Sequence, residues 1–460
     1  MRLLRPLFVV LLLAAGASRA ATLPELFQER LKSVVEVEFF IQSEIDRQPV
    51  MVLGTVVDDQ GTIVLPGPAI QPTVAPGQLK EFKVYRAGNT EATRAEYLGQ
   101  DAYTGWHFIR VEPKLRGELV PITHWPAMKS APALSEELWG IGLRGKDEDF
   151  LPYFLSSRVA TVMKLPQETA ICGSDVAGPG LPVFNTTGEF AGLALPSFGQ
   201  NYLVFSRNQH GSPIMLVNIE ESSAVQLARE VLPYLHRIPE TVSGRPLPWF
   251  GAYGLQPMDP DVAKLLKLEN QSGVVLSDIA SGTPAEQAGL RDRDIVLAID
   301  GSPLPRLKPD RIVAGYFSQQ ILLHRPGDTL NLTILRGSER KEVTVTLGSE
   351  PKLVREAERH YFDRLGVTVR EFLNADAISM RVAPTEHRGV VAHFIKPGGP
   401  AATAGLRPED WIREIDGTEI TSYQQALDLL HAVEVDKERS EVVFLVGRGA
   451  ETAVIRVKLI

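Results

Sequence analysis

The sequence predicts a mainly β protein in which a region of short strands precedes two copies of a mixed α+β module. Between residue 33 and about residue 215, apolar runs and turn residues alternate without an intervening helical pattern. Beyond that region, the stretch that begins at Gly273 recurs at Gly389. Short consecutive strands close into a barrel or a sandwich, and a repeat of this kind folds as one module per copy.

Composition sets the class of protein. A chain of 460 residues is long enough for about three domains. Hydrophobic residues make up 44% and charged residues 23%, as in ordinary globular proteins. The net charge of -8 argues against a nucleic-acid partner, which would select a basic face.

The N-terminus has the pattern of a secretory signal. Arg2 and Arg5 precede the apolar run LFVVLLLAAGA, and small residues follow at Ser18 and Ala20. The alternative is an uncleaved membrane anchor, for which the run is short, because a span needs about 20 residues. We therefore expect a signal peptide over residues 1–20, no membrane span after its cleavage, and a periplasmic or secreted product.

Cys172 is the only cysteine, so no intramolecular disulfide can form. No partner for a reactive thiolate is visible nearby in the sequence. We expect a small buried side chain rather than a nucleophile.

The strand region begins at Val35, Val37 and Phe39, which alternate with Glu36 and Glu38 and predict a half-buried strand. Further strands are predicted in the stretches MVLGTVV and TIVL, joined by a DDQG turn, and in FKVYRA, ELWGIGL and SSRVATVMKL. A helix-period stretch from Ser222 to Leu235 is expected to close the region, before the Pro/Gly-rich linker IPETVSGRPLPW.

The repeat is the strongest signal in the chain. GVVLSDIASGTPAEQAGLRDRDIVLAIDGSPL and GVVAHFIKPGGPAATAGLRPEDWIREIDGTEI share 15 of 32 positions without a gap. Each copy reads as a strand, a proline-capped short helix, a glycine turn, a second strand and an Asp-Gly turn. A helix-period segment (312–323 or 422–433) and closing strands follow each copy.

The pattern G-x-P-A-x-x-A-G-L-x-x-x-D-x-x-x-x-I-D-G, present twice, resembles PDZ domains of the bacterial, circularly permuted kind. The stretch AGPGLPVFN followed by TTGEFAGLAL is similar to the loop, strand, turn and strand around the serine of trypsin-like hydrolases. The combination resembles the HtrA/Deg family of envelope serine proteases. The resemblance implies a trypsin-like double β-barrel over residues 21–240 and PDZ domains over residues 241–349 and 355–460.

Serine proteases of this family need a serine, a histidine base and an orienting aspartate. The histidine frame matches residues 61–70 and places Pro68 at the histidine, and the aspartate frame matches residues 101–109 and places Gly105 at the aspartate. The serine frame, counted back from Pro182, places Pro179 at the serine. Proline also lacks the backbone N–H that the serine contributes to the oxyanion hole. The resemblance thus implies an HtrA-like protein without catalytic residues.

The alternative is a displaced catalytic site. Ser174 precedes Pro182 by eight residues, and the histidines of the region, His107, His124 and His210, lie outside the matching frame. We expect no metal and no cofactor, because no two histidines lie four residues apart, and Asp58-Asp59 is more simply explained as hairpin-turn chemistry.

PDZ domains bind peptides by strand addition, with the terminal carboxylate held on backbone N–H groups of an x-Φ-G-Φ loop. Residues 364–367 fit this loop in the second module, whereas residues 249–252 and 252–255 compete in the first. Gly251 is preferred, because Gly251 and Gly366 precede their repeats by similar lengths. The candidate peptide-binding residues are Phe250, Gly251, Ala252, Ile312, Tyr316, Leu365, Gly366, Val367, Tyr423 and Leu427, and core packing is an equal alternative for those on the helices.

The sequence leaves three functions open. The leading one is an exported peptide-binding pseudoprotease, with a scaffold or chaperone-like role in envelope protein quality control and with C-terminal peptides or unfolded envelope proteins as ligands. The others are an active serine endopeptidase with a non-standard site and a fixed-partner assembly protein of the envelope. The resemblance also implies a homotrimer held by the N-terminal part of the barrel. Phe27 and Phe39–Phe40 are candidate contacts for it, and an ordinary surface or core position is an equal alternative for these residues.

Overall fold

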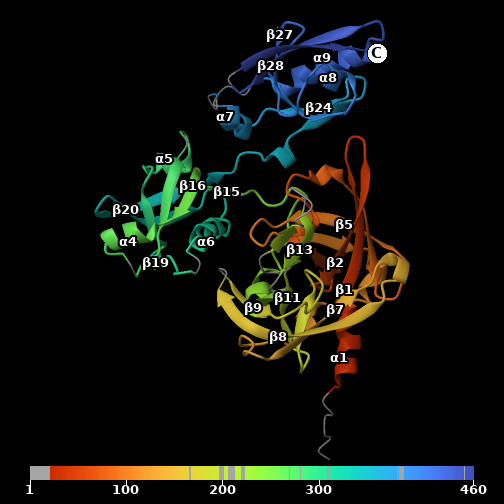
Figure 1. The fold of residues 1–460 in the computed structure, drawn as a ribbon, viewed down its shortest axis with the longest axis vertical. Helices are drawn as coiled ribbons and strands as arrows, with labels where there is room; N and C mark the ends of the chain where they lie inside the picture. The colour runs from red at the N-terminus through yellow and green to blue at the C-terminus, as the bar shows by residue number, and fades with distance from the viewer. Residues whose placement is uncertain are drawn as a thin grey trace, which may run out of the picture.

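A computed structural model describes residues 21–164, 167–195, 201–205, 213–218, 223–268, 270–279, 281–307, 310–380, 382, 388–449 and 451–459. The signal peptide predicted for residues 1–20 and the histidine at position 210 lie outside these residues. Figure 1 shows three lobes: a barrel region from the N-terminal half of the chain and two smaller α+β modules. No helix in the described ranges is long and apolar enough to cross a membrane.

The first barrel is closed by six antiparallel strands in the order β1-β2-β3-β6-β5-β4. A short helix, α1 (Leu23–Arg30), precedes it, and α2 (Pro113–Arg116) follows it. The strands are β1 (Val34–Gln42), β2 (Arg47–Val56), β3 (Thr62–Leu65), β4 (Leu79–Arg86), β5 (Thr93–Gln100) and β6 (His107–Val111). The predicted hairpin is present, because β2 pairs with β3 and the Asp58 carboxylate accepts the N–H groups of Gln60 and Thr62 in the turn.

The second barrel has the strand order β10-β11-β14-β9-β8-β7. Its strands are β7 (Glu137–Leu143), β8 (Pro152–Lys164), β9 (Glu168–Cys172), β10 (Pro182–Asn185), β11 (Phe190–Ala194) and β14 (Ser223–Leu227). A separate hairpin is formed by β12 (Asn201–Phe205) and β13 (Pro213–Asn218). The trypsin-like double barrel predicted from the sequence is confirmed.

The helix expected over Ser222–Leu235 is wrong for its first half. Residues 223–227 form β14, which pairs with β9 and β11 and so closes the second barrel, and only then do α3 (Ala228–Val231) and a 3-10 turn (Leu232–Tyr234) follow. The apolar spacing in this stretch is compatible with both structures. The segment forms a strand because β9 and β11 each offer an unpaired edge with which it can pair.

The half-buried pattern expected for β1 is also wrong. Glu36 and Glu38 are 7% and 9% exposed, although they alternate with the core residues Val35 and Val37. Tyr85 donates a hydrogen bond of 2.6 Å to the Glu38 carboxylate, and Lys146 lies 3.2 Å from it. Burial raises the pKa of Glu36 to about 7. Both faces of this strand are covered, because β1 lies in a closed barrel that packs against neighbouring segments.

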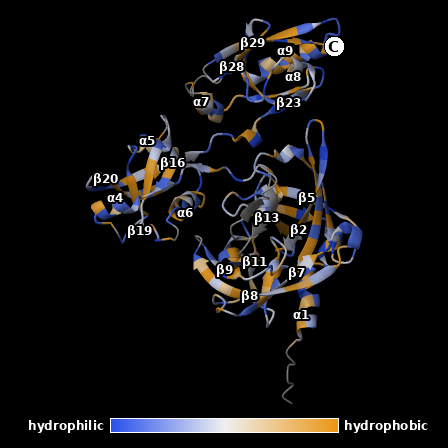
Figure 2. Cartoon of the chain, in the orientation of Figure 1, coloured by the Kyte–Doolittle hydropathy of each residue, from blue (hydrophilic) through white to orange (hydrophobic). Residues whose placement is uncertain are grey.

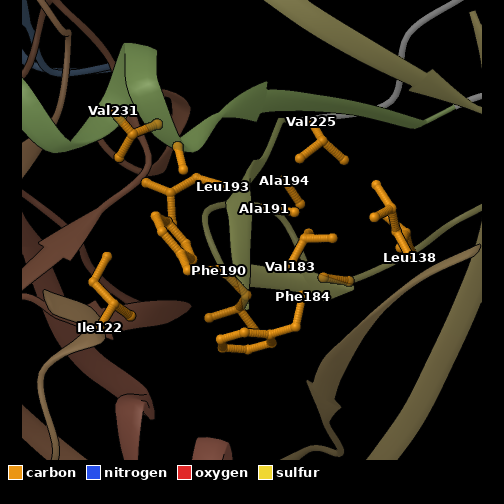
Figure 3. Packing of buried hydrophobic residues seen from close by; sticks show 14 of the residues in the cluster. Ile122, Leu138, Val183, Phe184, Phe190, Ala191, Leu193, Ala194, Val225 and Val231 are labelled. Carbon is orange, nitrogen blue, oxygen red and sulfur yellow. The ribbon is translucent and has the colours of Figure 1, made fainter. Parts of the chain in front are cut away.

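Aromatic and aliphatic side chains of β10, β11 and β14 fill the second barrel. Figure 3 shows Val183, Phe184, Phe190 and Leu193 pointing into one cluster. Cys172 belongs to the same cluster, and burial raises the pKa of its thiol to about 11, so it is the small core residue that the sequence predicts. Figure 2 shows hydrophobic residues alternating with hydrophilic ones along many strands.

Two of the phenylalanines considered for a trimer contact, Phe39 and Phe27, pack against aromatic residues of the same chain. Phe39 is fully buried and stacks on Phe82 with ring centroids 4.8 Å apart, so a surface role for Phe39 is wrong. Phe27 of α1 lies against Trp139 and Phe154 at 6.3 and 6.0 Å. The trimer itself stays a prediction.

The main sheet of the first module (module 1) has the order β16-β17-β18-β20-β21, with β19 on β18. Its elements are β15 (Pro248–Trp249), β16 (Ala252–Pro257), α4 (Pro260–Leu265), β17 (Val274–Ile279), α5 (Pro284–Gln287), β18 (Ile295–Ile299), β19 (Ser302–Pro303), α6 (Ile312–Ile321), β20 (Thr329–Arg336), β21 (Glu339–Thr346) and β22 (Gly348–Ser349). The last of these, β22, pairs with β15.

The second module (module 2) repeats this plan in the order β23-β24-β25-β26-β28-β29, with β27 on β26. Its elements are β23 (Arg359–Phe362), β24 (Val367–Glu371), α7 (Asn374–Met380), β25 (Val390–Ile395), α8 (Pro400–Thr403), β26 (Trp411–Ile415), β27 (Thr418–Glu419), α9 (Tyr423–Val435), β28 (Glu441–Arg448) and β29 (Glu451–Lys458). The helices α6 and α9 lie where the two helix-period segments predict them.

Candidate functional site

The positions that match the histidine and the aspartate of the family lie side by side in the first barrel. Pro68 lies in a single 3-10 turn (Gly67–Ala69) directly after β3, and Gly105 ends the turn before β6. The strands β3 and β6 pair, with Leu65 opposite His107, and so bring the two turns together. A Cβ added to Gly67 would lie 2.9 Å from the carbonyl oxygen of Gly105.

Pro179, the position that matches the serine, lies in a loop of the second barrel that contacts the first barrel near the same turns. A Cβ added to Gly180 would lie 2.9 Å from Cδ of Pro66, and the Thr55 hydroxyl donates to the carbonyl of Gly180 at 2.8 Å. The loop that carries Pro179 therefore rests on the first barrel beside the turn of Pro68. The structure brings together the three regions that sequence matching selected separately.

Residues 178–181 form a tight turn. The N–H of Leu181 donates to the carbonyl of Gly178 at 3.0 Å, and Gly180 has a φ of +80°. Proline at the second position and glycine with positive φ at the third are the signature of a type II turn. The order Gly-Pro-Gly thus sets the loop conformation from the local sequence alone.

This turn leaves no amide for an oxyanion. The N–H of Gly178 donates to Ile141 at 3.3 Å and that of Gly180 to Ala194 at 2.8 Å, both to main-chain carbonyls. Leu181 closes the turn, and Pro179 has no N–H. An oxyanion hole needs donors that point at a developing negative charge. In residues 178–181 each N–H already has a main-chain acceptor.

The turn before β6 is held by Asp101 rather than by a catalytic group. Asp101 is 3% exposed and accepts hydrogen bonds from the N–H and the hydroxyl of Thr104. Arg237, from the end of the barrel region, pairs with the same carboxylate at 3.0 Å. Gly105 donates to the main-chain carbonyl of Asp101, which completes the turn.

His107 lies beside the turn of Pro68, but it is not poised as a base. Tyr97 Oη lies 2.9 Å from its Nδ1, and its Nε2 lies 3.3 Å from the carbonyl of Gly67. Burial lowers the pKa of His107 to about 4. A neutral ring that donates from Nε2 to a carbonyl and accepts from a tyrosine satisfies both nitrogens, so His107 is a structural residue of the barrel.

The other candidates for chemistry lie elsewhere. The hydroxyl of Ser174 is 3.1 Å from that of Ser157, and His124 forms an exposed pair with Asp59 at 3.1 Å. The described residues contain no group of three or more His, Cys, Asp or Glu side chains that could hold a metal ion.

The preferred loop of module 1 has the geometry that its sequence indicates. Gly251 has a φ of +87°, and a Cβ there would lie 2.3 Å from Cβ of Thr283. Phe250 is buried edge-on against Phe317 of α6, and its carbonyl accepts the N–H of Ala285 at 2.9 Å. Ala252 then begins β16, whereas Gly254 of the competing frame lies inside that strand. Ile312 and Tyr316 are partly buried on α6.

The loop of module 2 is built in the same way. Leu365 is fully buried, its carbonyl accepts the N–H of Ala401 at 3.0 Å, and Gly366 has a φ of +69°. Val367 begins β24, and Tyr423 and Leu427 on α9 are partly buried beside the core.

Sequence reasoning missed one strand at this loop, β23. Its residues, Arg359 to Phe362, lie directly before the loop, and the Phe362 carbonyl accepts the Gly366 N–H at 2.8 Å. The adjacent aromatic residues Tyr361 and Phe362, which favour strands, directly precede a turn that ends at Gly366, and this is a short strand signal that could have identified it.

Comparison with known proteins identifies both modules. The PDZ domain family matches residues 260–347 and, separately, residues 395–443. A probable periplasmic serine endoprotease DegP-like from Chlamydia pneumoniae is 26% identical over 195 residues, which cover 42% of this chain and 37% of the relative. A protein of the same name from Pseudomonas fulva is 26% identical over 303 residues, which cover 62% of this chain and 57% of the relative.

The chain thus spans between about a third and somewhat more than half of the curated relatives it matches. Among solved structures, a variant of the HtrA-type protease AlgW with a tripeptide superposes with a TM-score of 0.50 at 15% identity, over 71% of this chain and 96% of AlgW. That likeness concerns the fold. With two PDZ domains after a trypsin-like double barrel, the chain is similar to the HtrA/DegP-like serine proteases in sequence and in fold.

Proposed function

We propose that this protein binds peptides through its PDZ domains and does not hydrolyse them. The proposal assigns residues 1–20 to a signal peptide, residues 21–240 to a protease-like domain without activity, and residues 241–349 and 355–460 to the PDZ domains. It places the protein in the periplasm, where the names of the DegP-like relatives place those proteins. The ligands are C-terminal peptides or unfolded envelope proteins, and the role is that of a scaffold or chaperone-like factor in protein quality control.

The Gly178–Leu181 turn is the observation that supports the absence of hydrolysis. Nucleophilic catalysis by serine needs a hydroxyl, a base that removes its proton, and amides that stabilise the oxyanion. Pro179 supplies neither hydroxyl nor amide, and the neighbouring amides donate to Ile141 and Ala194. His107, beside the turn of Pro68, is neutral and bonded at both nitrogens.

The open edge of module 1 supports peptide binding. In the described part of the chain, β16 pairs with β17 alone, and α6 lies beside β16. A sheet edge beside a helix, preceded by a glycine loop, is the arrangement by which PDZ domains add a peptide as a further strand.

Two measurements on the purified full chain test the proposal. A fluorophosphonate probe should label no serine, and casein should not be degraded. Degradation that is lost in Ser174→Ala would establish the alternative of a displaced protease site. A library of peptides with random C-termini should bind more tightly with free carboxylates than with amidated ends. Equal binding of the two libraries would remove carboxylate capture from the proposal.

A further inference from the structure

The two modules differ at the sheet edge where a peptide would add. In module 1 the segment before the glycine loop, β15, turns away from β16 and pairs with β22 at the end of the module. The outer edge of β16 therefore carries no strand in the described residues. The helix α6 lies beside β16.

In module 2 the corresponding edge is occupied. The strand β23 pairs with β24 over four residues, from Arg359 opposite Arg370 to Phe362 opposite Val367. The other edge of β24 pairs with β25. The helix α9 packs against β23, which is labelled in Figure 2. A strand from the same chain thus lies between β24 and α9.

The direction of β23 is that of a PDZ ligand. It runs antiparallel to β24 and ends at the glycine loop, so Phe362 stands where the last residue of a bound peptide would lie. The Phe362 carbonyl accepts the N–H of Gly366 at 2.8 Å, one of the donors expected to hold a terminal carboxylate. The loop amide of Arg364 is also engaged, because it donates to Glu434 at 3.1 Å.

The side chains of β23 fill the pocket as a ligand would. Phe362 is fully buried in the same cluster as Leu365 and Leu430 of α9. Two residues earlier on the same face, His360 packs against His431 of α9 with ring centroids 4.7 Å apart, and Phe362 lies 5.1 Å from the same ring.

The turn between β23 and β24 is fastened to α9. The guanidinium of Arg364 donates to the carbonyls of Val433, Asp436 and Arg439 at 2.9, 2.5 and 2.6 Å. A cation bonded to carbonyls at the C-terminal end of a helix is favoured by the helix dipole. Arg364 therefore holds β23 against the helix.

We propose that residues 359–362 are the internal ligand of module 2, so that external peptides bind module 1 while module 2 stays closed. This inference rests on the proposed peptide-binding function. It also assigns the class of peptide that would compete for module 2: one that ends in phenylalanine with a free carboxylate and carries an aromatic ring two residues earlier.

The test uses the full chain and a photo-crosslinking peptide ending in Arg-His-Tyr-Phe with a free carboxylate, together with the random C-terminal library in the same crosslinking format. In the wild type we expect labelling in residues 252–257 and 312–321 of module 1 and none in residues 367–371 and 423–435. Tyr361→Pro combined with Arg364→Ala should release β23, since proline removes an amide from the strand and alanine removes the clamp. Labelling of residues 367–371 and 423–435 should rise at least tenfold in this variant.

Arg388→Ala, which breaks an exposed pair with Glu419 in the same module, is the matched control and should behave as the wild type.

Hydrogen exchange on the wild type gives a second measurement that does not depend on a variant. The amides of β24 should exchange more slowly than those of β16, since β24 is paired on both edges. Labelling of β24 in the wild type, or equal exchange of β24 and β16, would overturn the internal ligand. The internal ligand would also be overturned if, in the double variant, the amides of β25 to β28 remain protected from exchange and module 2 is still not labelled by the peptide. Labelling of module 2 in the variant with none in module 1 of either protein would support the internal ligand and refute peptide binding by module 1.

Discussion

The effect of a buried carboxyl group on the stability of this protein depends on its hydrogen-bonding partners. Glu36 and Glu38 are neighbours on β1 and both are nearly inaccessible, yet they differ in partners. Glu38 is bonded by Tyr85 and Lys146, whereas the raised pKa of Glu36 arises from burial. A carboxyl group whose pKa rises on folding favours the folded state in its protonated form, so its contribution to stability falls as the pH rises from about 4.5 to about 7.

The variant Glu36→Gln should abolish this pH dependence. Relative to the wild type, it should gain up to about 3 kcal/mol of unfolding free energy between pH 4 and pH 8, because a shift of one pKa unit corresponds to about 1.4 kcal/mol. Urea unfolding of the barrel region, followed by tryptophan fluorescence at both pH values, measures the difference. Glu38→Gln is the control and should lose stability at pH 8, since its carboxylate is paired. A parallel pH dependence of Glu36→Gln and wild type would contradict the raised pKa that burial gives Glu36.

At the scale of one element, the Gly178–Leu181 turn shows how a loop can keep the frame of a protease without its chemistry. Its conformation follows from proline and glycine at the two central positions. The second position of a type II turn also accepts other residues. A serine placed there should therefore leave the barrel intact.

We expect Pro179→Ser to remain inactive. The new hydroxyl would have no base, because both nitrogens of His107 are bonded, and the neighbouring amides would still donate to main-chain carbonyls. Fluorophosphonate labelling and casein degradation should stay at the level of the wild type. The triple change Pro68→His, Gly105→Asp and Pro179→Ser is the comparison, as it restores all three side chains. Casein degradation by the single variant would show that the positions were assigned wrongly.

In the glycine loop of module 1, the backbone conformation depends on a single residue, Gly251. Gly251→Ala would hold an L-residue at a φ of +87° and bring Cβ to 2.3 Å from Thr283. We expect a loss of at least about 1–2 kcal/mol of stability in module 1 and weaker peptide binding. Gly315→Ala on α6 is the matched control: in the described residues, no atom outside its chain neighbours and the backbone of its own helix lies within 4 Å of the added Cβ, and alanine should stabilise the helix by about 1 kcal/mol. Unchanged peptide affinity in Gly251→Ala, measured by fluorescence anisotropy, would exclude this loop from the binding site.

At the scale of the whole molecule, a few polar contacts join module 2 to the barrels. Arg355 donates to Gln100 of β5 at 2.7 Å, and Thr368 of β24 donates to Glu44, in the loop between β1 and β2, at 2.9 Å. Single hydrogen bonds of this kind contribute roughly 0.5–3 kcal/mol each, depending on charge. The position of module 2 should therefore be sensitive to their removal.

The variant Arg355→Ala with Thr368→Val should loosen module 2. Small-angle scattering should show a larger radius of gyration than in the wild type, and limited proteolysis should cleave residues 350–358 faster. Lys352→Ala, which removes an exposed pair with Glu371 within the same region, is the control and should leave both measurements unchanged. Superimposable scattering curves for the double variant and the wild type would show that other contacts hold the module.

The sequence alone determined the features that depend on local patterns. The repeat at Gly273 and Gly389 predicted two modules, because turn glycines, proline caps and apolar spacing recur with the backbone they specify. Pro179 by its identity excludes a serine hydroxyl and a backbone N–H at its position. The turn type around it also follows from adjacent residues.

Tertiary structure decided what depends on a remote partner. Residues 223–227 became a strand because β9 and β11 offered free edges, and Glu36 became buried because the barrel closes over both faces of β1. The same holds for the loop of module 2, where the Gly366 amide is engaged by Phe362. The local sequence limits the conformations that a segment can adopt. Which segment pairs with an open strand edge depends on the packing energy with the rest of the chain.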